Sequence, residues 1–126
     1  MLINRYQDIS EIDREARKDY IDRHSAFIHC ADKGTKEENF KITVKVGEEY
    51  THPDDFDHYI SWVQLWDGET MLAQANYMPG ALGNVGNQFE VDFHIRPTKK
   101  KMKLIAHAYC TKHGLWQSDE KLVEIS

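Results

Sequence analysis

Polar and apolar residues alternate with a period of two along much of this chain. The clearest run is residues 88–96, where apolar side chains from Phe89 to Ile95 alternate with charged or polar ones. Successive side chains of a strand point to opposite faces, so this run predicts a strand with one buried face. A second alternation over residues 42–46, closed by Gly47, predicts another strand.

Shorter apolar runs bounded by turn residues predict the remaining strands. They cover residues 27–30, 59–66, 71–78, 102–109 and 121–125. The dipeptide Asp67-Gly68 suits a tight primed turn, so the two runs around it should form a hairpin. Glycine and asparagine are frequent in residues 79–87, which predicts a loop.

The N-terminal segment has a helical period instead. Ser10 is a suitable N-cap, and Ile12, Ala16 and Tyr20 recur every four residues, which predicts a helix from Ser10 to about Asp22. Six or seven short strands behind one helix are typical of an all-β sandwich of about seven strands with an N-terminal helical arm. We expect a single domain, residues 1–126, with the arm at 1–23 and the sandwich at 24–126.

Composition narrows the class of protein. The chain has 126 residues, 40% of them hydrophobic and 29% charged, which is typical of a globular domain. The net charge of -5 argues against a general nucleic-acid binder, which needs a basic surface. No apolar run approaches the roughly 20 residues of a membrane span, and the first residues lack the pattern of a secretory signal. We therefore expect a cytoplasmic protein that binds neither nucleic acid nor membrane.

Cysteine and histidine carry the candidate chemistry. Cys110 and His113 are three residues apart at the end of a predicted strand, and His52 and His58 flank a separate loop. A soft thiolate among several imidazoles suits a transition metal, and one cysteine with several histidines favours redox iron or copper over structural zinc. Taken alone, a cysteine three residues before a histidine is more often a small core residue near a surface residue.

The other titratable residues are weaker candidates. His24 and His29 could each add an imidazole, whereas His94 and His107 lie in alternating strands and are interpreted as structural. The three aspartates between His52 and His58 are interpreted as solvated charges or as partners of metal ligands. A disulfide between the two cysteines is not expected in a reducing cytosol. The sequence contains no serine nucleophile elbow, phosphate-binding glycine loop or His-Glu-x-x-His motif.

Several segments together resemble the superoxide reductases of the desulfoferrodoxin/neelaredoxin family. They are Val44–Glu49 leading into His52-Pro53, then Asp57–Ile60, Thr98–Lys101 and Ala108–Trp116. The paired pattern, His-Pro-x4-His followed by Cys-x-x-His-Gly-Leu-Trp, is specific. The resemblance implies an immunoglobulin-like β-sandwich. The chain lacks the cysteines of the additional N-terminal domain of longer members, so it resembles the single-iron, neelaredoxin type.

The resemblance also implies a metal site of one iron held by four histidines and one cysteine. Carried over, the cysteine is Cys110, and the histidines are His24, His52, His58 and His113. The family motif Glu-Lys-His-Val-Pro is replaced here by residues 22–26, Asp-Arg-His-Ser-Ala. Arg23 thus stands where a lysine would attract superoxide, and Asp22 stands where a glutamate would cap the oxidised iron. These two are the catalytic candidates.

The activity implied is one-electron reduction of superoxide to hydrogen peroxide at a mononuclear non-haem iron. A separate electron donor such as rubredoxin would return the iron to the ferrous state, and the family implies a homo-oligomer, a tetramer or a dimer. Two alternatives stay open. One is a non-catalytic, immunoglobulin-like module that binds metal or carries electrons, and the other is a small zinc hydrolase.

Overall fold

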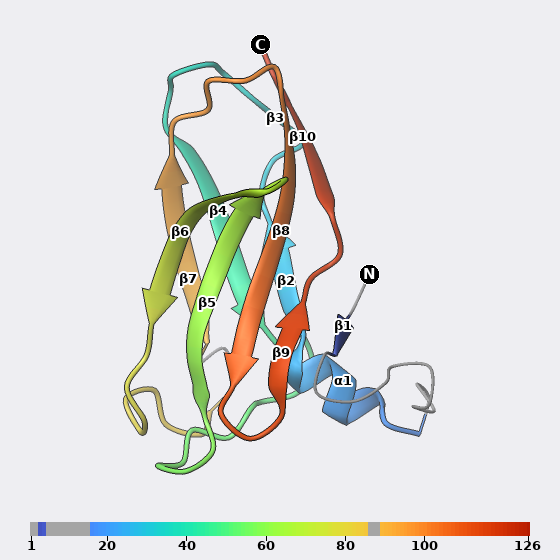
Figure 1. Cartoon of the computed structure of the whole chain (residues 1–126), viewed down its shortest axis with the longest axis vertical. Coiled ribbons are helices and arrows are strands. Elements are labelled where there is room, and N and C mark those ends of the chain that lie inside the picture. The colour runs from blue at the N-terminus through green and yellow to red at the C-terminus, as the bar shows by residue number, and fades with distance from the viewer. Residues whose placement is uncertain (1–2, 5–15, 86–88) are drawn as a thin grey trace.

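Two β-sheets face each other and enclose the core of the protein (Figure 1). The computed structural model describes residues 3–4, 16–85 and 89–126. The larger sheet contains β1 (Ile3–Asn4), β3 (Lys33–Gly34), β5 (Ile60–Asp67), β6 (Thr70–Asn76), β8 (Lys101–Cys110), β9 (Gly114–Gln117) and β10 (Lys121–Ile125). The smaller sheet contains β2 (Ala26–His29), β4 (Phe40–Val46) and β7 (Glu90–Ile95).

Alternating burial along the strands explains why the two sheets pack together. In β4, every second residue from Phe40 to Val46 is buried, and in β8 every second residue from Met102 to Cys110 is buried. These side chains join Val63, Leu65 and Phe89 in one continuous core. Removing apolar surface from water is the main favourable contribution to folding, and here both sheets contribute to it. The prediction of an all-β sandwich is confirmed, and the immunoglobulin-like description fits the arrangement approximately.

The long strand β8 organises the larger sheet and leads to the site. Its second half pairs with β9, its first half pairs with β10, and β5 pairs with it along the other edge. Strands β9 and β10 therefore lie in tandem along one edge of β8. Because Cys110 is the last residue of β8, the turn into β9 lies at the lower end of the sandwich in Figure 1.

Helix α1 (Lys18–His24) packs against this same end. Its buried residues Tyr20 and Ile21 form a second small apolar cluster with Trp116 of β9. The predicted helix from Ser10 to Asp22 is confirmed for residues 18–22, and it continues to His24. The proposed cap at Ser10 and the apolar position Ile12 lie outside the described residues.

The predicted strands agree with the structure to within one or two residues. The hairpin at Asp67-Gly68 is confirmed, since Asp67 pairs with Thr70 across a two-residue loop. No strand occurs in the described part of the predicted loop, residues 79–85. The sequence interpretation missed the short strands β1, β3 and β9. Among the residues that the structure describes, no helix has the length and apolar character that a membrane span requires.

Gly47 makes the turn that leads β4 towards the site. Its φ is +82°, and an added Cβ would lie 2.5 Å from the carbonyl oxygen of Tyr50. We expect Gly47→Ala to lower the free energy of unfolding by more than about 1 kcal/mol, measured by urea denaturation, because strain and a backbone clash combine. Gly68→Ala is the control, since its φ is +57° but nothing lies within 4 Å of the added atom. An equal loss in both variants would mean that the clash contributes nothing.

Candidate metal centre

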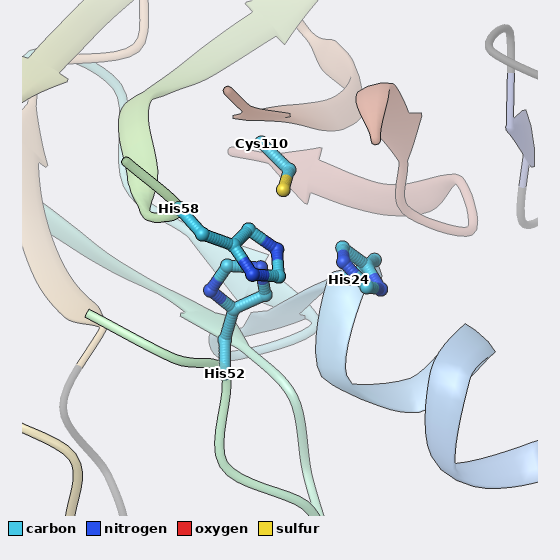
Figure 2. A group of neighbouring side chains, drawn as sticks. All are labelled: His24, His52, His58 and Cys110. Atoms are coloured by element: carbon cyan, nitrogen blue, oxygen red, sulfur yellow. The ribbon is translucent and has the colours of Figure 1, made fainter. Parts of the chain in front are cut away.

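Four potential metal ligands converge at the end of the sandwich beside α1. They are His24, His52, His58 and Cys110, and their ligand atoms all lie within 4.8 Å of one another. Figure 2 shows the sulfur of Cys110 pointing towards the imidazoles, with His24 at the end of the helix. His52 and His58 both belong to the segment between β4 and β5. Segments far apart in the sequence thus meet at a single point.

His113 lies in the same cluster. Its Nδ1 is 3.1 Å from Nε2 of His24 and 3.7 Å from Sγ of Cys110. The turn after β8 places it there, because Cys110 pairs with Gly114 and residues 111–113 form the connecting turn. The structure therefore brings together all five residues that the sequence singled out as ligands.

Backbone carbonyls fix the orientation of two of the imidazoles. Nδ1 of His24 lies 2.7 Å from the carbonyl oxygen of Tyr20, and Nδ1 of His52 lies 2.6 Å from that of Pro53. A carbonyl oxygen only accepts hydrogen bonds, so each Nδ1 carries the proton and donates it. Each Nε2 is then unprotonated and carries a lone pair that a metal could accept. Metal-binding histidines commonly use this arrangement to hold the ring and set its tautomer.

Two buried nitrogens fit a metal particularly well. Nε2 of His52 and Nε2 of His58 are buried, and neither has a hydrogen-bond partner in the described part of the chain. Leaving a buried polar atom unsatisfied costs free energy, typically about 1–3 kcal/mol. A metal ion at this point would satisfy both lone pairs. A donor set of imidazole nitrogens and one thiolate suits a transition metal, iron among them.

Aromatic side chains pack around the imidazoles and limit their movement. The ring of Trp116 stacks on His24 with centroids 4.9 Å apart and an interplanar angle of 20°. Tyr20 meets the ring of His113 edge-on, and Phe89 meets His52 in the same way. Apart from Tyr20, these aromatic residues come from the sandwich, so the docking of α1 and the geometry of the cluster depend on each other.

Burial keeps the histidines neutral at physiological pH. It lowers the pKa of His24 and of His52 to about 3 in each case, because removal from water penalises the charged imidazolium. Burial also lowers the pKa of His58, with the Lys112 ammonium adding to the effect, and that of His113, with His58 adding to it. Neutral imidazoles are the form that binds metal, so no proton has to be displaced from them.

Cys110 experiences two opposing influences. Burial raises the pKa of its thiol, whereas the backbone N–H groups of Lys112 and His113 and the charge of Lys112 lower it. The N–H of His113 donates to Sγ over 3.4 Å. Both backbone N–H groups could donate hydrogen bonds to a metal-bound thiolate. Coordination to a metal itself deprotonates a thiol. Cys110 and Cys30 are both free, in agreement with the expected absence of a disulfide.

Asp22 interacts with a loop. Its carboxylate accepts hydrogen bonds from three successive backbone N–H groups, those of Glu48, Glu49 and Tyr50, at 2.9–3.1 Å from Oδ2. The loop that follows Gly47 is thereby tied to α1. Since this loop leads directly to His52, Asp22 holds in place the segment that carries two of the imidazoles.

Removing the charge of Asp22 should therefore destabilise the fold. We expect Asp22→Asn to lower the free energy of unfolding by about 1–3 kcal/mol, because charge-assisted hydrogen bonds are lost and an amide accepts less strongly. Urea denaturation of the metal-free protein measures the effect. Glu49→Gln is a matched control, since the one interaction of the Glu49 side chain with the described residues is an exposed ion pair with Lys18 at 3.5 Å. Equal stability of Asp22→Asn and the wild type would contradict this role.

Arg23 bonds back along its own helix. Its Nε donates to the carbonyl oxygen of Asp19 at 3.1 Å, and Nη2 lies 3.2 Å from the Asp19 carboxylate. The side chain is 30% exposed, and its charge contributes to lowering the pKa of His52 and His58. The guanidinium is thus close enough to influence the cluster while paired with an acid.

The remaining candidates lie apart from the cluster or have other partners. His29 pairs with Glu48 on the surface, and His94 is exposed on β7. Asp54 differs from the expectation of a solvated charge. It is only 4% exposed and accepts hydrogen bonds from the N–H groups of Leu82 and Gly83.

The sequence interpretation did not foresee two features around the cluster, the burial of Asp54 and the effect of the Lys112 charge. Nothing local in the sequence signals that Asp54 is buried, because its partners are about 30 residues away. The influence of Lys112 could have been found, since Lys112 lies between Cys110 and His113. Its charge affects the pKa values of His58, His113 and Cys110.

A β-sandwich whose end holds four imidazoles and one thiol around a single point defines a class of protein, the small non-haem metalloproteins of redox type. The desulfoferrodoxin family model matches residues 14–119, and the chain belongs to this family. The earlier resemblance is thus confirmed.

Curated relatives and solved structures agree with this assignment. The chain is 35% identical over 89 residues to the superoxide reductase of Thermococcus kodakarensis, a match that covers 65% of this chain and 74% of the relative. It is 26% identical over 112 residues to the neelaredoxin of Megalodesulfovibrio gigas, covering 79% and 85%. A variant of the superoxide reductase (neelaredoxin) from Ignicoccus hospitalis superposes with a TM-score of 0.74 and 26% identity, covering 94% of this chain and 91% of the other.

Proposed function

We propose that this protein is a superoxide reductase, which reduces superoxide by one electron to hydrogen peroxide at a mononuclear iron. The observation that carries the proposal is the convergence of His24, His52, His58 and Cys110, with two buried nitrogens that have no hydrogen-bond partner among the residues described. Family membership and the names of the relatives support the same activity.

Five residues of this chain would hold the iron. They are His24, His52 and His58 through Nε2, His113 through Nδ1, and Cys110 through Sγ. A bound iron ion would supply the single electron that superoxide needs. Neutral imidazoles leave the positive charge of the ion in place, and the single thiolate offsets only one unit of it. The site therefore keeps a net positive charge that favours the approach of an anion. Superoxide also takes up two protons, which come from solvent, and leaves as hydrogen peroxide.

Arg23 would contribute to this attraction through its field, since its guanidinium is paired with Asp19. We expect Arg23→Gln to lower the rate constant for superoxide by a few-fold at low salt and by less at high salt, because screening weakens such steering. Pulse radiolysis over a range of ionic strengths measures this. Arg96→Gln is the matched control, because Arg96 contacts the carbonyl oxygen of Glu37. A salt-independent loss would show a local structural effect instead of steering.

We further propose that Asp22 acts as a positioning residue and does not bind the metal. Its carboxylate is engaged by three backbone N–H groups. Using it to cap an oxidised iron would require the release of all three. The Asp22→Asn variant described above should therefore keep the visible spectrum of the oxidised iron protein while it loses stability.

The proposal extends to partners. A separate one-electron donor such as rubredoxin would return the iron to the ferrous state. The protein would work in the cytoplasm, and two free cysteines are consistent with a reducing compartment. It would form a homo-oligomer, a tetramer or a dimer. Among the described residues, β6 pairs only with β5 and β7 only with β4, so each sheet has an open edge for assembly.

One set of measurements tests the activity. The purified protein should contain about one iron per chain, and its reduced form should consume superoxide at a rate near encounter, with one hydrogen peroxide produced per iron oxidised. Reduced protein that binds iron but does not react with pulse-generated superoxide would contradict the proposal and favour a non-catalytic electron carrier.

A further inference from the structure

The outer face of the larger sheet carries a row of apolar side chains close to the metal centre. Trp62 of β5 pairs with Tyr109 of β8, and Tyr109 pairs with Leu115 of β9. Paired residues of neighbouring strands point to the same face, so the three side chains lie side by side. The rings of Trp62 and Tyr109 stack at 5.4 Å with an interplanar angle of 15°. We call these three residues the aromatic row.

The surroundings of the aromatic row lack formal charge. The next row along the sheet consists of Gln64, His107 and Gln117, and Trp66 and Ile105 follow. In a chain with 29% charged residues, a partly exposed stretch of sheet without Asp, Glu, Lys or Arg over these rows is unusual. Interface cores are depleted in charge and enriched in aromatic residues, and Tyr109 is 36% exposed. This part of the face therefore has the composition of a contact surface.

The aromatic row is also directly connected to the metal centre. Tyr109 immediately precedes Cys110, whose side chain points the other way, into the cluster. A single peptide unit thus links an exposed aromatic ring to the sulfur at the site. At the same end of the sheet, Lys112 lies in the turn after β8 and forms no ion pair with any residue that the structure describes. An exposed positive charge thus lies in the turn that follows the row, three residues after Tyr109.

We propose that the aromatic row is the docking surface for the electron donor and the point at which its electron enters. This inference rests on the proposed function. The partner would be a small one-electron carrier protein whose redox group lies under an apolar surface bordered by acidic residues that face Lys112. In the step, the donor loses one electron and the oxidised iron gains it, through Tyr109 and the backbone to Cys110. No bond is formed or broken, and no proton moves.

The size and charge of the surface favour a transient donor over a second copy of this chain. Weak electron-transfer complexes bury less than about 1,200 Å², whereas stable interfaces typically bury about 1,200–2,000 Å². Three side chains and their neighbours suit the smaller class. In a symmetric contact each copy presents the same patch, which holds no acidic residue to face Lys112, whereas a carrier with acidic residues around its redox group would supply the complementary charge.

The test compares Tyr109→Glu and Leu115→Glu with Trp66→Gln as the matched control. Each glutamate places a charge in the uncharged row, while Trp66 lies two rows further along the same face. Rubredoxin is the probe. Calorimetry with oxidised rubredoxin gives the Kd, and stopped-flow mixing of the oxidised iron protein gives the rate of reduction by reduced rubredoxin and, separately, by dithionite. Pulse radiolysis of the pre-reduced protein gives the reaction with superoxide.

We expect both glutamate variants to raise the Kd for rubredoxin, and to lower the rate of reduction by rubredoxin, by at least about tenfold. A change of this size is typical when one hot-spot residue of an interface is altered. The rates with dithionite and superoxide should stay within twofold, and Trp66→Gln should stay close to the wild type. Thermal melting checks that each variant is folded. If Tyr109→Glu unfolds, Tyr109→Ser replaces it under the same expectations.

Three outcomes would contradict the proposed docking surface. The first is an unchanged Kd and an unchanged rate of reduction by rubredoxin in both glutamate variants, and the second is an equally large change of both in Trp66→Gln. The third is dissociation of an oligomer in the glutamate variants with an unchanged rate of reduction by rubredoxin, which would assign the row to a contact between copies. Failure of the proposed function gives a different result from failure of the docking surface. If the protein is not a superoxide reductase, the pre-reduced wild-type protein does not react with superoxide. Binding of rubredoxin to the row is measured separately, by calorimetry.

Discussion

Replacing Cys110 with serine should abolish the visible sulfur-to-iron charge-transfer absorption of the oxidised protein. Among the described residues, its thiol is the one sulfur in the cluster. Cys30 follows the last residue of β2 and lies outside the cluster. A serine hydroxyl fits the space of the thiol but stays protonated at neutral pH and is a poor ligand for iron. Absorption spectra of the variant after oxidation, at matched protein concentration, measure the effect.

Metal affinity should fall in the same variant. Loss of residues that merely support a metal ligand costs about 10–100-fold in affinity, so loss of the ligand itself should cost at least about tenfold. Competition with a chelator, followed by metal analysis, gives this number. Cys30→Ser is the control, because Cys30 is half-buried and outside the cluster, and it should keep both the colour and the iron. Colour that persists in Cys110→Ser would refute the sulfur ligand.

The strands could be predicted because their signal is local. Alternating burial in β4 and β8 follows directly from residues two apart, and it needs no knowledge of the partner strand. Strand β9 has no such signal. It is four residues long, follows a turn that ends at Gly114 with φ +82°, and exists because it pairs with the second half of β8. A pairing between segments is a tertiary property, and single-sequence patterns do not contain it.

The candidate site shows the same division. Cys110 and His113 are three residues apart, and His52 and His58 share one loop, so motif spacing identifies each pair. Bringing His24 to them depends on the packing of α1 against Trp116 through a separate apolar cluster. The family resemblance supplied that residue, and spacing alone did not. The engagement of Asp22 with three N–H groups likewise depends on a loop about 26 residues away.

The metal-free protein should lose stability steeply as the pH falls below about 6.5. His24 and His52 have a pKa of about 3 in the folded protein, whereas an imidazole in the unfolded chain titrates near 6.5. Between these values the unfolded state binds more protons, so acid favours unfolding and the stability present at pH 7 is lost progressively. Each imidazole contributes a slope of up to about 1.4 kcal/mol per pH unit in this window.

Urea denaturation of the metal-free protein between pH 7.5 and 4.5 measures this slope, and substitutions assign it. His52→Gln should give a flatter dependence than the wild type, even if its stability at pH 7 is lower, because one depressed imidazole is absent. His94→Gln is the control for replacing a histidine, since His94 is exposed on β7 and lies outside the cluster. Carboxylates contribute equally to all three proteins, so they cancel in the comparison. Identical slopes would contradict the burial of neutral imidazoles and, with it, the readiness of these nitrogens to receive a metal at neutral pH.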